Sequence, residues 1–262
     1  MAQVKPKKAL GQHFLTDLSV AMRIAATLDG YSLPVLEIGP GMGVLTRFLL
    51  EQHPGKVDVV EIDTESVQYL DSHFPELKGH IIEGDFLKMP LDTVFSGEEF
   101  AVIGNYPYNI SSQIFFKILE YKDRIPVCSG MLQREVAERL AAAPGTKARG
   151  ILSVLLQAWY DVEYLFTVSE NVFNPPPKVK SGVIRMRRNG VTDLGCDAAL
   201  FKTVVKTTFG QRRKTIRKSL GGLLPPGVKL PENCELGGMR PEQLSVSQFV
   251  ELTNLTSSLR NK

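Results

Sequence analysis

The sequence predicts an α/β fold: a doubly wound, mostly parallel sheet with one antiparallel strand, followed by a small all-helical C-terminal domain. Short apolar segments alternate with segments of helical periodicity from residue 17 to residue 132, which is the pattern of strands joined by crossover helices. Hydrophobic residues make up 43% of the 262 residues, enough for a sizeable core. After residue 190 the periodicity is helical. We therefore expect two domains, residues 1–190 and 191–262.

The first domain is expected to alternate helices and strands. Asp17 precedes the first amphipathic segment, where its carboxylate can cap the helix by accepting hydrogen bonds from the first N–H groups. β-branched residues dominate the strand segments, most clearly around Val57–Val60. The expected helices cover residues 17–29, 44–50, 65–72 and 112–120, and the expected strands cover 35–38, 56–62, 80–83, 100–104 and 127–132.

The pattern changes after residue 160. Residues 160–167 and 181–187 are predicted to be strands, and only a proline-rich loop at 171–177 separates them. Because no crossover helix fits in this loop, we expect the pair to be antiparallel. Helices are expected over residues 198–209, 212–220 and 244–259.

Composition excludes several classes of protein. No apolar run approaches the roughly 20 residues of a membrane-spanning helix, and the first residues lack the apolar stretch of a secretion signal. Cys128, Cys196 and Cys234 are far apart, and the four histidines show no ligand spacing. We expect a cytoplasmic protein with no metal site, no disulfide and no membrane partner.

The net charge of +3 conceals an uneven distribution. Residues 11–170 carry 12 basic and 22 acidic side chains, whereas residues 171–218 carry 12 basic and 2 acidic ones. Lys5, Lys7 and Lys8 add a basic N-terminal arm. This segregation is typical of a protein that grips a polyanion, although a solvated basic face without a partner gives the same pattern.

A glycine cluster follows the first predicted strand. Gly39, Gly41 and Gly43 allow a tight turn and a close approach of the backbone to a ligand. A dinucleotide-binding loop would need Gly or Ala where Val44 stands, and Glu37 before the glycines would repel a pyrophosphate. The acid suits a ligand with an amino group and no phosphate, such as S-adenosylmethionine.

Two more acids follow neighbouring strands. Glu61 ends the second strand, where a carboxylate can accept hydrogen bonds from both ribose hydroxyls. Asp85 follows the third strand and can accept from the exocyclic amine of an adenine, with Phe86 beside it for packing. Each acid alone is more often a solvated residue at a strand end, but three in register with a glycine loop favour a methyltransferase site.

The turn Asn105-Tyr106-Pro107-Tyr108 follows the fourth strand, at the sheet edge where such folds bind ligands. The Asn105 side-chain oxygen and the Tyr106 carbonyl can accept the two hydrogens of an exocyclic amine. Pro107 restricts the backbone around these acceptors, and Tyr108 offers a ring on which a base can stack. The alternative is a proline turn with two packing tyrosines.

These segments resemble the bacterial small-subunit rRNA adenine dimethyltransferase family over nearly the whole chain. The matching motifs are Lys8–Leu15, Glu37–Gly43, Glu61–Asp63, Gly84–Asp85, Asn105–Ser111, Gln133–Leu140, Val172–Val179 and Phe209–Thr215. The last three are far more specific than a glycine loop. This sequence has His13 and Tyr106 where the family usually has Asn and Leu.

The resemblance implies a Rossmann-like class I S-adenosylmethionine-dependent methyltransferase that acts as a monomer. Its implied reaction is N6,N6-dimethylation of two adjacent adenosines in the 3′-terminal hairpin loop of 16S rRNA. The implied partner is the 30S subunit or its precursor, and the implied role is in small-subunit biogenesis.

The resemblance also implies roles for individual residues. Phe173 would be a second aromatic wall opposite Tyr108. The residues expected at the cofactor are Gln12, His13, Leu15, Gly39, Gly41, Glu61, Ile62, Asp85, Phe86 and Asn105. Those expected at the RNA are Lys5, Lys7, Lys8, Lys178, Lys180, Arg185, Arg187, Arg212, Arg213 and Lys214.

Three alternatives stay open. A large-subunit rRNA adenine methyltransferase of the macrolide-resistance type would share the chemistry, although the motifs at Gln133–Leu140 and Phe209–Thr215 favour the small-subunit family. A non-catalytic ribosome assembly factor could retain the fold, but Asn105 and Tyr108 are both present. A nicotinamide-dependent dehydrogenase is disfavoured by Val44 and by the acid before the loop.

Overall fold

The structure is a computed structural model that describes residues 4–260. The chain divides into two compact units: unit 1 is Met1–Glu138 with Val162–Arg188, and unit 2 is Arg139–Asp161 with Asn189–Lys262. The sequence pattern places residues 139–161 in the first domain. In the structure α6 (Ile151–Gln157), which lies in this segment, packs against α7 (Ala198–Gly210) of unit 2. A helix from the middle of the chain therefore contributes to the second core.

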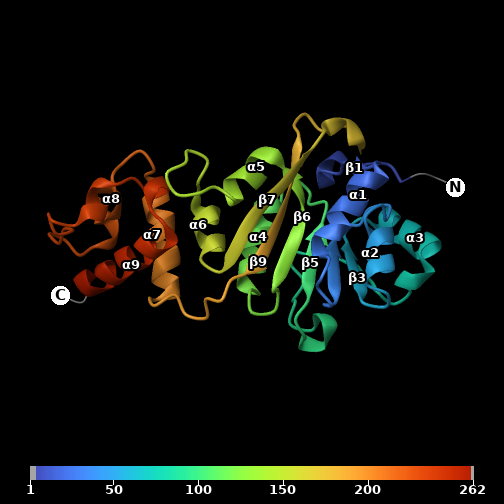
Figure 1. Cartoon of the computed structure of the whole chain (residues 1–262), viewed down its shortest axis with the longest axis horizontal. Helices are drawn as coiled ribbons and strands as arrows, with labels where there is room; N and C mark the ends of the chain where they lie inside the picture. Colours follow the sequence, from blue (N-terminus) through green and yellow to red (C-terminus); the bar gives the residue numbers. More distant parts are fainter. Residues whose placement is uncertain (1–3, 261–262) are drawn as a thin grey trace. The chain divides into compact units, whose positions relative to one another are not determined.

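Unit 1 is built on a seven-stranded sheet with the order β4-β3-β2-β5-β6-β9-β7 (Figure 1). β2 to β6 are parallel to their neighbours, and β9 runs antiparallel to β6. This confirms the doubly wound, mostly parallel sheet with an antiparallel strand. The strands are β2 (Val35–Ile38), β3 (Val57–Glu61), β4 (Ile81–Glu83), β5 (Ala101–Gly104), β6 (Val127–Gln133), β7 (Tyr160–Val168) and β9 (Ser181–Arg188).

The strand order reverses beside β2, because β3 and β4 extend the sheet on one side of it and β5 on the other. In doubly wound sheets, ligands bind outside the carboxyl ends of the strands at this switch point. Strands β2 and β5 are fully buried, as expected for parallel strands covered on both faces.

Four helices of unit 1 begin and end close to their predicted positions: α1 (Leu18–Ala25), α2 (Thr46–Gln52), α3 (Thr64–His73) and α4 (Ser111–Glu120). A fifth helix, α5 (Arg134–Leu140), follows β6. Asp17 caps α1 by accepting hydrogen bonds from the N–H groups of Ser19 and Val20. The short helices α5 and α6 were not predicted. Figure 1 shows α1, α2 and α3 grouped at the N-terminal end of this unit.

Unit 2 is helical, as expected. Its helices are α6, α7, α8 (Ile216–Ser219) and α9 (Val246–Arg260), and α7 packs against both α6 and α9. Phe249 on α9 contacts Phe201 and Phe209 on α7 at ring-centroid distances of 6.5 and 6.1 Å. The helix predicted over 212–220 is shorter, because a turn closed by the Lys214 N–H and the Gln211 carbonyl precedes α8.

Short 3-10 helices occur in both units. They are η1 (Lys8–Leu10), η2 (Ala26–Leu28), η3 (Pro75–Leu77), η4 (Val94–Gly97), η5 (Glu170–Val172), η6 (Leu220–Leu223), η7 (Glu235–Gly238) and η8 (Pro241–Gln243).

A two-stranded sheet that the sequence analysis missed joins the N-terminal segment to the proline-rich loop. β1 (Phe14–Leu15) pairs antiparallel with β8 (Phe173–Asn174), and Leu15 lies opposite Phe173. The Asn174–Pro175 peptide bond is cis. Each strand has only two residues, so neither shows a recognisable period in the sequence.

Among residues 4–260, no helix combines the length and apolarity needed to cross a membrane.

Candidate active site

A cavity in unit 1 lies at the carboxyl ends of β2, β3, β4 and β5. Five segments line it: residues 9–15, 37–45 without Gly43, 60–62, 84–87 and 105–110. Every residue expected at the cofactor lines this cavity, and so do Tyr106, Pro107 and Tyr108 of the predicted catalytic turn. Segments far apart in the sequence are thus brought together because parallel strands end at one edge of the sheet.

The glycine loop lets the backbone turn back over the end of β2. Gly41 has a φ of 55°, in the left-handed region that favours glycine. A Cβ atom here would lie 2.9 Å from the Phe14 ring. The Gly41 N–H donates to Oε2 of Glu61 at 3.1 Å, which ties the loop to the end of β3.

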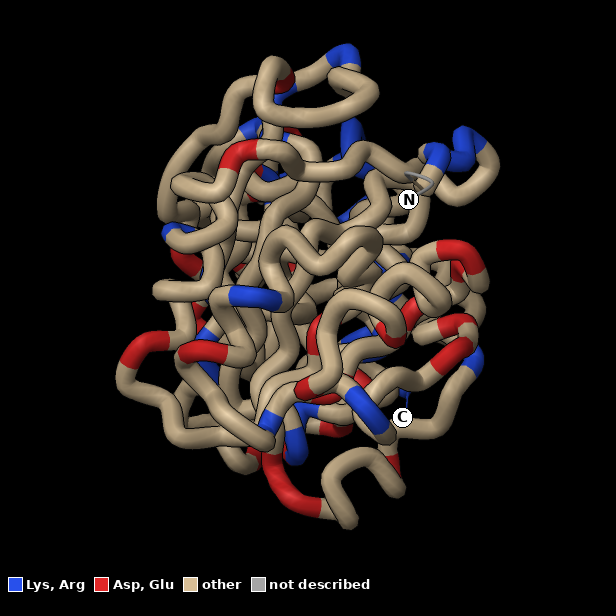
Figure 2. The backbone as a smooth tube through the Cα atoms, turned by 90° about the vertical axis from the view of Figure 1, so that its right-hand side faces the viewer, with Lys and Arg blue, Asp and Glu red and all other residues tan. Residues whose placement is uncertain are grey.

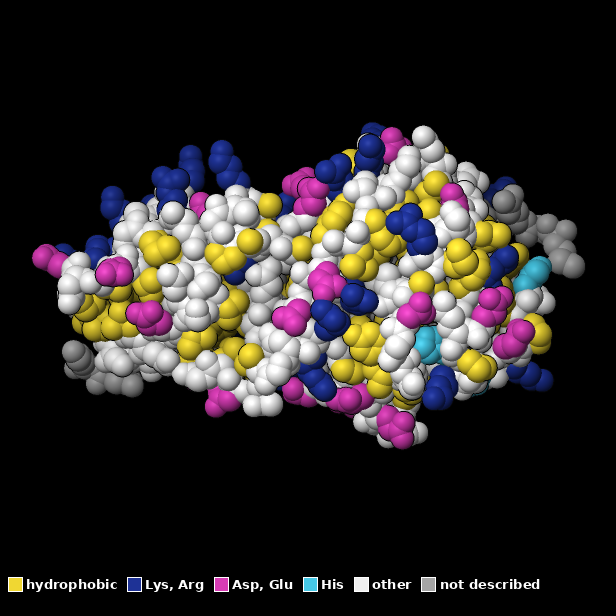
Figure 3. Space-filling view, in the orientation of Figure 1, with side chains coloured by type: hydrophobic (Ala, Val, Ile, Leu, Met, Phe, Trp, Pro, Cys, Tyr) yellow, Lys and Arg dark blue, Asp and Glu magenta, His cyan; other side chains and the backbone are white. Residues whose placement is uncertain are grey.

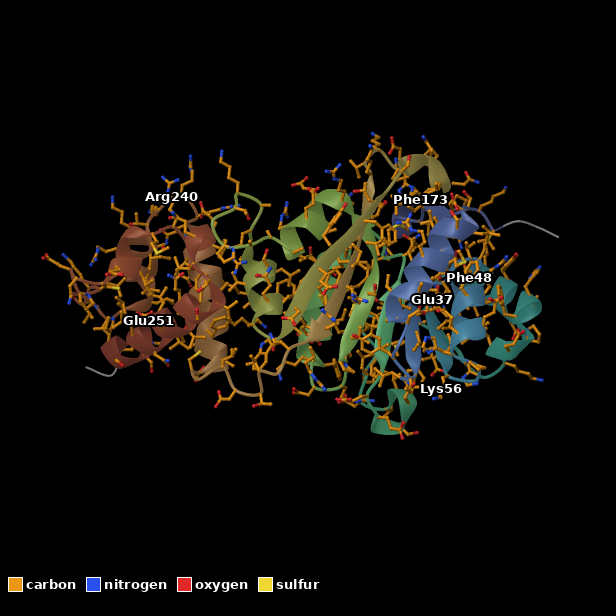
Figure 4. The ribbon with its side chains drawn as sticks, in the orientation of Figure 1. Glu37, Phe48, Lys56, Phe173, Arg240 and Glu251 are labelled. Atoms are coloured by element: carbon orange, nitrogen blue, oxygen red, sulfur yellow. The ribbon has the colours of Figure 1, made fainter. Side chains whose placement is uncertain are left out.

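Glu37 is a buried acid in the cavity lining, with 1% of its surface exposed (Figure 4). Within the described residues its Oε2 atom has no hydrogen-bond partner. The pKa of this carboxyl is raised to about 8, mainly by burial; the Thr46 hydroxyl opposes the rise and the nearby charge of Glu61 adds to it. An acid in this position gains most from a cation or a hydrogen-bond donor placed in the cavity.

Glu61 and Asp85 lie on neighbouring strand ends, as predicted. Glu61 is buried, and its carboxylate accepts hydrogen bonds from the N–H groups of Gly41, Ile62 and Asp63. Burial raises the pKa of Glu61, and these three hydrogen bonds oppose that rise. Asp85 accepts from the Leu87 N–H at 2.9 Å. Ile62 is 50% exposed and gives the cavity an apolar surface beside the two acids.

Two residues of the turn after β5, Asn105 and Tyr106, line the cavity and carry oxygen atoms that can accept hydrogen bonds. Nδ2 of Asn105 donates to the His13 carbonyl at 3.1 Å, so Oδ1 is at the other end of the amide. The Tyr106 N–H donates to the Met131 carbonyl at 2.9 Å. In the described part of the chain, no hydrogen bond reaches the Tyr106 carbonyl oxygen. Because both residues line the cavity, we expect these two oxygens to be the acceptors that a ligand meets.

The Tyr106 side chain anchors this turn. Its ring is 1% exposed, and its hydroxyl donates to the Ser129 carbonyl at 2.6 Å. The ring fits a gap between Gly104 and Gly130: a Cβ at either position would lie within 3.0 Å of it. The family's usual leucine could pack here but could not make this hydrogen bond. Burial raises the pKa of the Tyr106 hydroxyl well above its usual value, so it remains a donor.

The two residues predicted to stack on the target base, Tyr108 and Phe173, differ in their surroundings. Tyr108 lines the cavity, stacks on His13 with 5.5 Å between ring centroids, and shares a 2.6 Å hydrogen bond with Ser181. Phe173 is 4% exposed, belongs to the hydrophobic core and does not line the cavity (Figure 4). The pairing of β8 with β1 positions Phe173 beside Leu15. A stacking role for Phe173 stays a prediction that requires its side chain to turn outward.

The basic residues expected at the RNA form two groups. Four are engaged within the protein: Lys7 with Asp63 and Glu65, Arg185 and Arg187 with Glu163, and Arg212 with Glu242 and the Lys147 carbonyl. The other six are exposed and, within the described chain, form no such contact: Lys5, Lys8, Lys178, Lys180, Arg213 and Lys214. Figure 3 shows basic side chains gathered along one edge of unit 2.

No group of three or more His, Cys, Asp or Glu side chains is placed to hold a metal ion among residues 4–260. Asp63, Phe14 and Asn109 are functional candidates that the sequence analysis did not single out. The Phe14 ring lies against Gly41, where it leaves no room for a Cβ atom. Similarly, Oδ1 of Asn109 lies 2.6 Å from where a Cβ on Gly11 would be. All three lie within motifs that match the family, Lys8–Leu15, Glu61–Asp63 and Asn105–Ser111, and this position was the signal in the sequence that could have identified them.

Comparison with known proteins gives consistent results. A family profile described as "Ribosomal RNA adenine dimethylase" matches residues 3–257. Proteins named "Ribosomal RNA small subunit methyltransferase A" from Parabacteroides distasonis and Bacteroides thetaiotaomicron are 68% and 64% identical to this chain. Each alignment covers 97% of this chain, and 94% and 95% of the respective relative.

Solved structures show the same fold. A dimethyladenosine transferase from Plasmodium falciparum has a TM-score of 0.78 at 23% identity, covering 94% of this chain and 98% of that one. The 23S rRNA methyltransferase ErmE has a TM-score of 0.66 at 29% identity, covering 91% and 99%.

Proposed function

The chain belongs to the ribosomal RNA adenine dimethylase family, and we propose that it dimethylates N6 of two adjacent adenosines in the 3′-terminal hairpin loop of 16S rRNA. The observation that carries this proposal is that Asn105 and Tyr106, whose amide and peptide oxygens can accept hydrogen bonds, line the same cavity as the glycine loop and its acids. The chain is an rRNA methyltransferase by family; the substrate position and the residue roles are proposals.

The cavity lining fits S-adenosylmethionine as the methyl donor. Glu37 has an unpartnered oxygen suited to an ammonium group, Glu61 lies where a ribose would be held, and Ile62 can cover an adenine face. Asp85 is placed to accept from the adenine amine. When bound, the cofactor supplies an electrophilic methyl group on a positively charged sulfur.

Asn105 and Tyr106 activate the target amine. The exocyclic nitrogen of adenine is a weak nucleophile because its lone pair is delocalised into the ring. Two acceptors that take its hydrogens favour a tetrahedral nitrogen, whose lone pair can attack. The acceptors are held in advance by the Asn105–His13 hydrogen bond and by the buried Tyr106 ring, so little reorganisation is needed.

Tyr108 supports the target base by stacking, which requires that the base be unpaired and turned out of its own stack. A loop adenosine meets this requirement at a lower cost than a base in a duplex. The six exposed basic residues defined above hold the RNA backbone, and each phosphate contact adds to the salt dependence of binding.

The alternatives are less well supported. The relatives at 64% and 68% identity are named small-subunit enzymes, whereas ErmE, a 23S rRNA methyltransferase, is 29% identical. A non-catalytic assembly factor would not need both acceptors to remain at the cavity. The proposal also includes that the enzyme acts as a monomer in the cytoplasm. Its proposed partner is the 30S particle or its precursor.

The test is a methylation assay with purified protein and unmodified 30S particles. We expect N6,N6-dimethyladenosine in the digested rRNA by mass spectrometry. Naked 16S rRNA and unmodified 50S particles serve as comparison substrates. A product confined to 50S particles, or methyl groups on another base, would overturn the proposed substrate.

A further inference from the structure

The N-terminal segment forms one wall of the cavity. Residues 9–15 all line it, although they precede the first strand of the main sheet. The wall begins in a compact turn: the N–H groups of Leu10 and Gln12 donate to the Lys7 carbonyl, and the Lys7 N–H donates to Oε1 of Gln12 at 2.7 Å. Two hydrogen bonds therefore link Lys7 to Gln12.

Asp63 holds this turn from outside the cavity. Its carboxylate is 2% exposed and does not line the cavity. One oxygen forms an ion pair with Lys7, and the other accepts from Nε2 of Gln12 at 3.1 Å. The same carboxylate caps α3 by accepting from the Glu65 N–H and the Ser66 hydroxyl. Figure 2 shows basic positions close to the N-terminus and acidic positions along the edge below them.

The charge on Asp63 is maintained by these partners. Burial acts to raise the pKa of its carboxyl, but the hydrogen bonds from Lys7, Gln12, Ser66 and Glu65 outweigh this and lower the pKa. The acid thus remains ionised while buried. A buried carboxylate with four donors is a rigid anchor, because moving any donor away leaves part of a charge unsatisfied.

The opposite end of the wall is held by the catalytic turn. The His13 carbonyl accepts from Asn105, and β1 pairs with β8 directly after it. The end near Asp63 lies beside Glu61, whose carboxylate accepts from the Asp63 N–H. The wall is thus fixed to the two strand ends that carry the proposed cofactor acid and the proposed acceptor amide.

We propose that Asp63 is a positioning residue that, through Lys7 and Gln12, holds the N-terminal wall against the cofactor cavity. The proposal rests on the proposed function only in naming the cavity's occupant. Loosening this anchor frees the end of the wall near Lys7 and Gln12, whereas the end at His13 stays tied to Asn105 and, through β1, to β8. Cofactor binding therefore weakens, while the rate of the chemical step with the cofactor bound changes little.

The test compares Asp63→Asn and Lys7→Gln with Lys8→Gln as a matched control. Asparagine can still cap α3 but cannot form the ion pair. Lys8 is exposed and, in the described structure, its side chain has no partner, so Lys8→Gln removes the same charge one residue away. Hydrogen exchange of peptides covering residues 7–15 reports on the wall without any cofactor.

We expect Asp63→Asn and Lys7→Gln to speed exchange of this segment by about tenfold, which corresponds to losing one charge-assisted hydrogen bond. The Kd for S-adenosylmethionine should rise by a similar factor, with kcat at saturating cofactor within about twofold. Lys8→Gln should change neither the exchange of this segment nor the Kd for S-adenosylmethionine, both of which are measured without RNA. The two effects should not add in the double variant, because both act on one ion pair.

Unchanged exchange in both variants, or a fall in kcat with an unchanged Kd, would overturn the role of Asp63. If Asp63→Asn fails to fold, Lys7→Gln decides the question alone, because its side chain is 40% exposed and its loss cannot collapse the core. If exchange of the wall rises in the variants but the wild type methylates no rRNA, the proposed function is wrong. The positioning role of Asp63 is then still supported.

Discussion

Replacing Glu37 by glutamine tests whether the cavity contains a carboxyl that stays protonated near neutral pH. Burial raises the pKa of Glu37 in the folded protein to about 8, whereas the ordinary value is 4.5. The folded state therefore retains a proton that the unfolded chain releases. Stability falls as pH rises from about 4.5 to about 8 and then levels off, because above pH 8 both states are ionised. Glutamine has nearly the same shape and no titration.

The size of the effect follows from these two pKa values. At 1.36 kcal/mol per pKa unit, the raised pKa of Glu37 lowers the free energy of unfolding by about 2 kcal/mol at pH 6 and by about 5 kcal/mol at pH 9. The free energy of unfolding of the wild type, relative to Glu37→Gln, should therefore fall by about 3 kcal/mol between these pH values. Titrating groups that do not interact with Glu37 cancel in the difference, and Glu61 is the neighbour whose charge does interact with it.

Urea denaturation of both proteins at several pH values, without cofactor, measures this difference. A constant gap between wild type and variant from pH 6 to pH 9 would refute the reasoning, because it would mean that Glu37 has the same protonation in both states. Saturating S-adenosylmethionine should reduce the pH dependence, since a nearby cation stabilises the ionised carboxylate.

Three further predictions concern the catalytic turn and the RNA surface. Asn105→Ala should lower methyl transfer by roughly 10²-fold or more with little change in cofactor Kd, as measured in single-turnover assays and by calorimetry; equal loss of both would contradict its role as acceptor. Tyr106→Phe should reduce the free energy of unfolding by about 1–3 kcal/mol in urea, because the Ser129 carbonyl loses its donor; no loss would contradict the anchoring hydrogen bond. Arg213→Gln should reduce the salt dependence of rRNA binding by about one phosphate contact in filter binding at several salt concentrations, whereas Arg187→Gln should reduce it less because Arg187 is paired with Glu163; the reverse order would contradict the proposed surface.

Much of the main sheet could be predicted from the sequence, because buried parallel strands are continuous apolar runs and the helices between them have a clear period. The positions of Glu61, Asp85 and Asn105 followed from this, since Glu61 ends a strand and the other two stand within two residues of a strand end. The tie between Asp63 and Lys7 could not be predicted, because they are 56 residues apart and meet only through folding.

Elements without a period of their own were also missed. The strands β1 and β8 have two residues each, and α5 and α6 have seven, so none shows a full amphipathic pattern. The burial of Phe173 depends on the pairing of β8 with β1 and could not be seen in the motif around it. Pairing of Arg185 and Arg187 with Glu163 likewise depends on which side chains meet across the folded unit.

The discontinuous make-up of unit 2 limits how this chain can be cut. A fragment that starts at residue 189 would keep α7, α8 and α9 but lose α6, and the side of α7 that α6 covers would face water. A fragment ending at residue 188 would carry α6 without the helix it packs on. Neither half is a self-sufficient module, and shuffling this tail onto another methyltransferase would require grafting residues 139–161 with it.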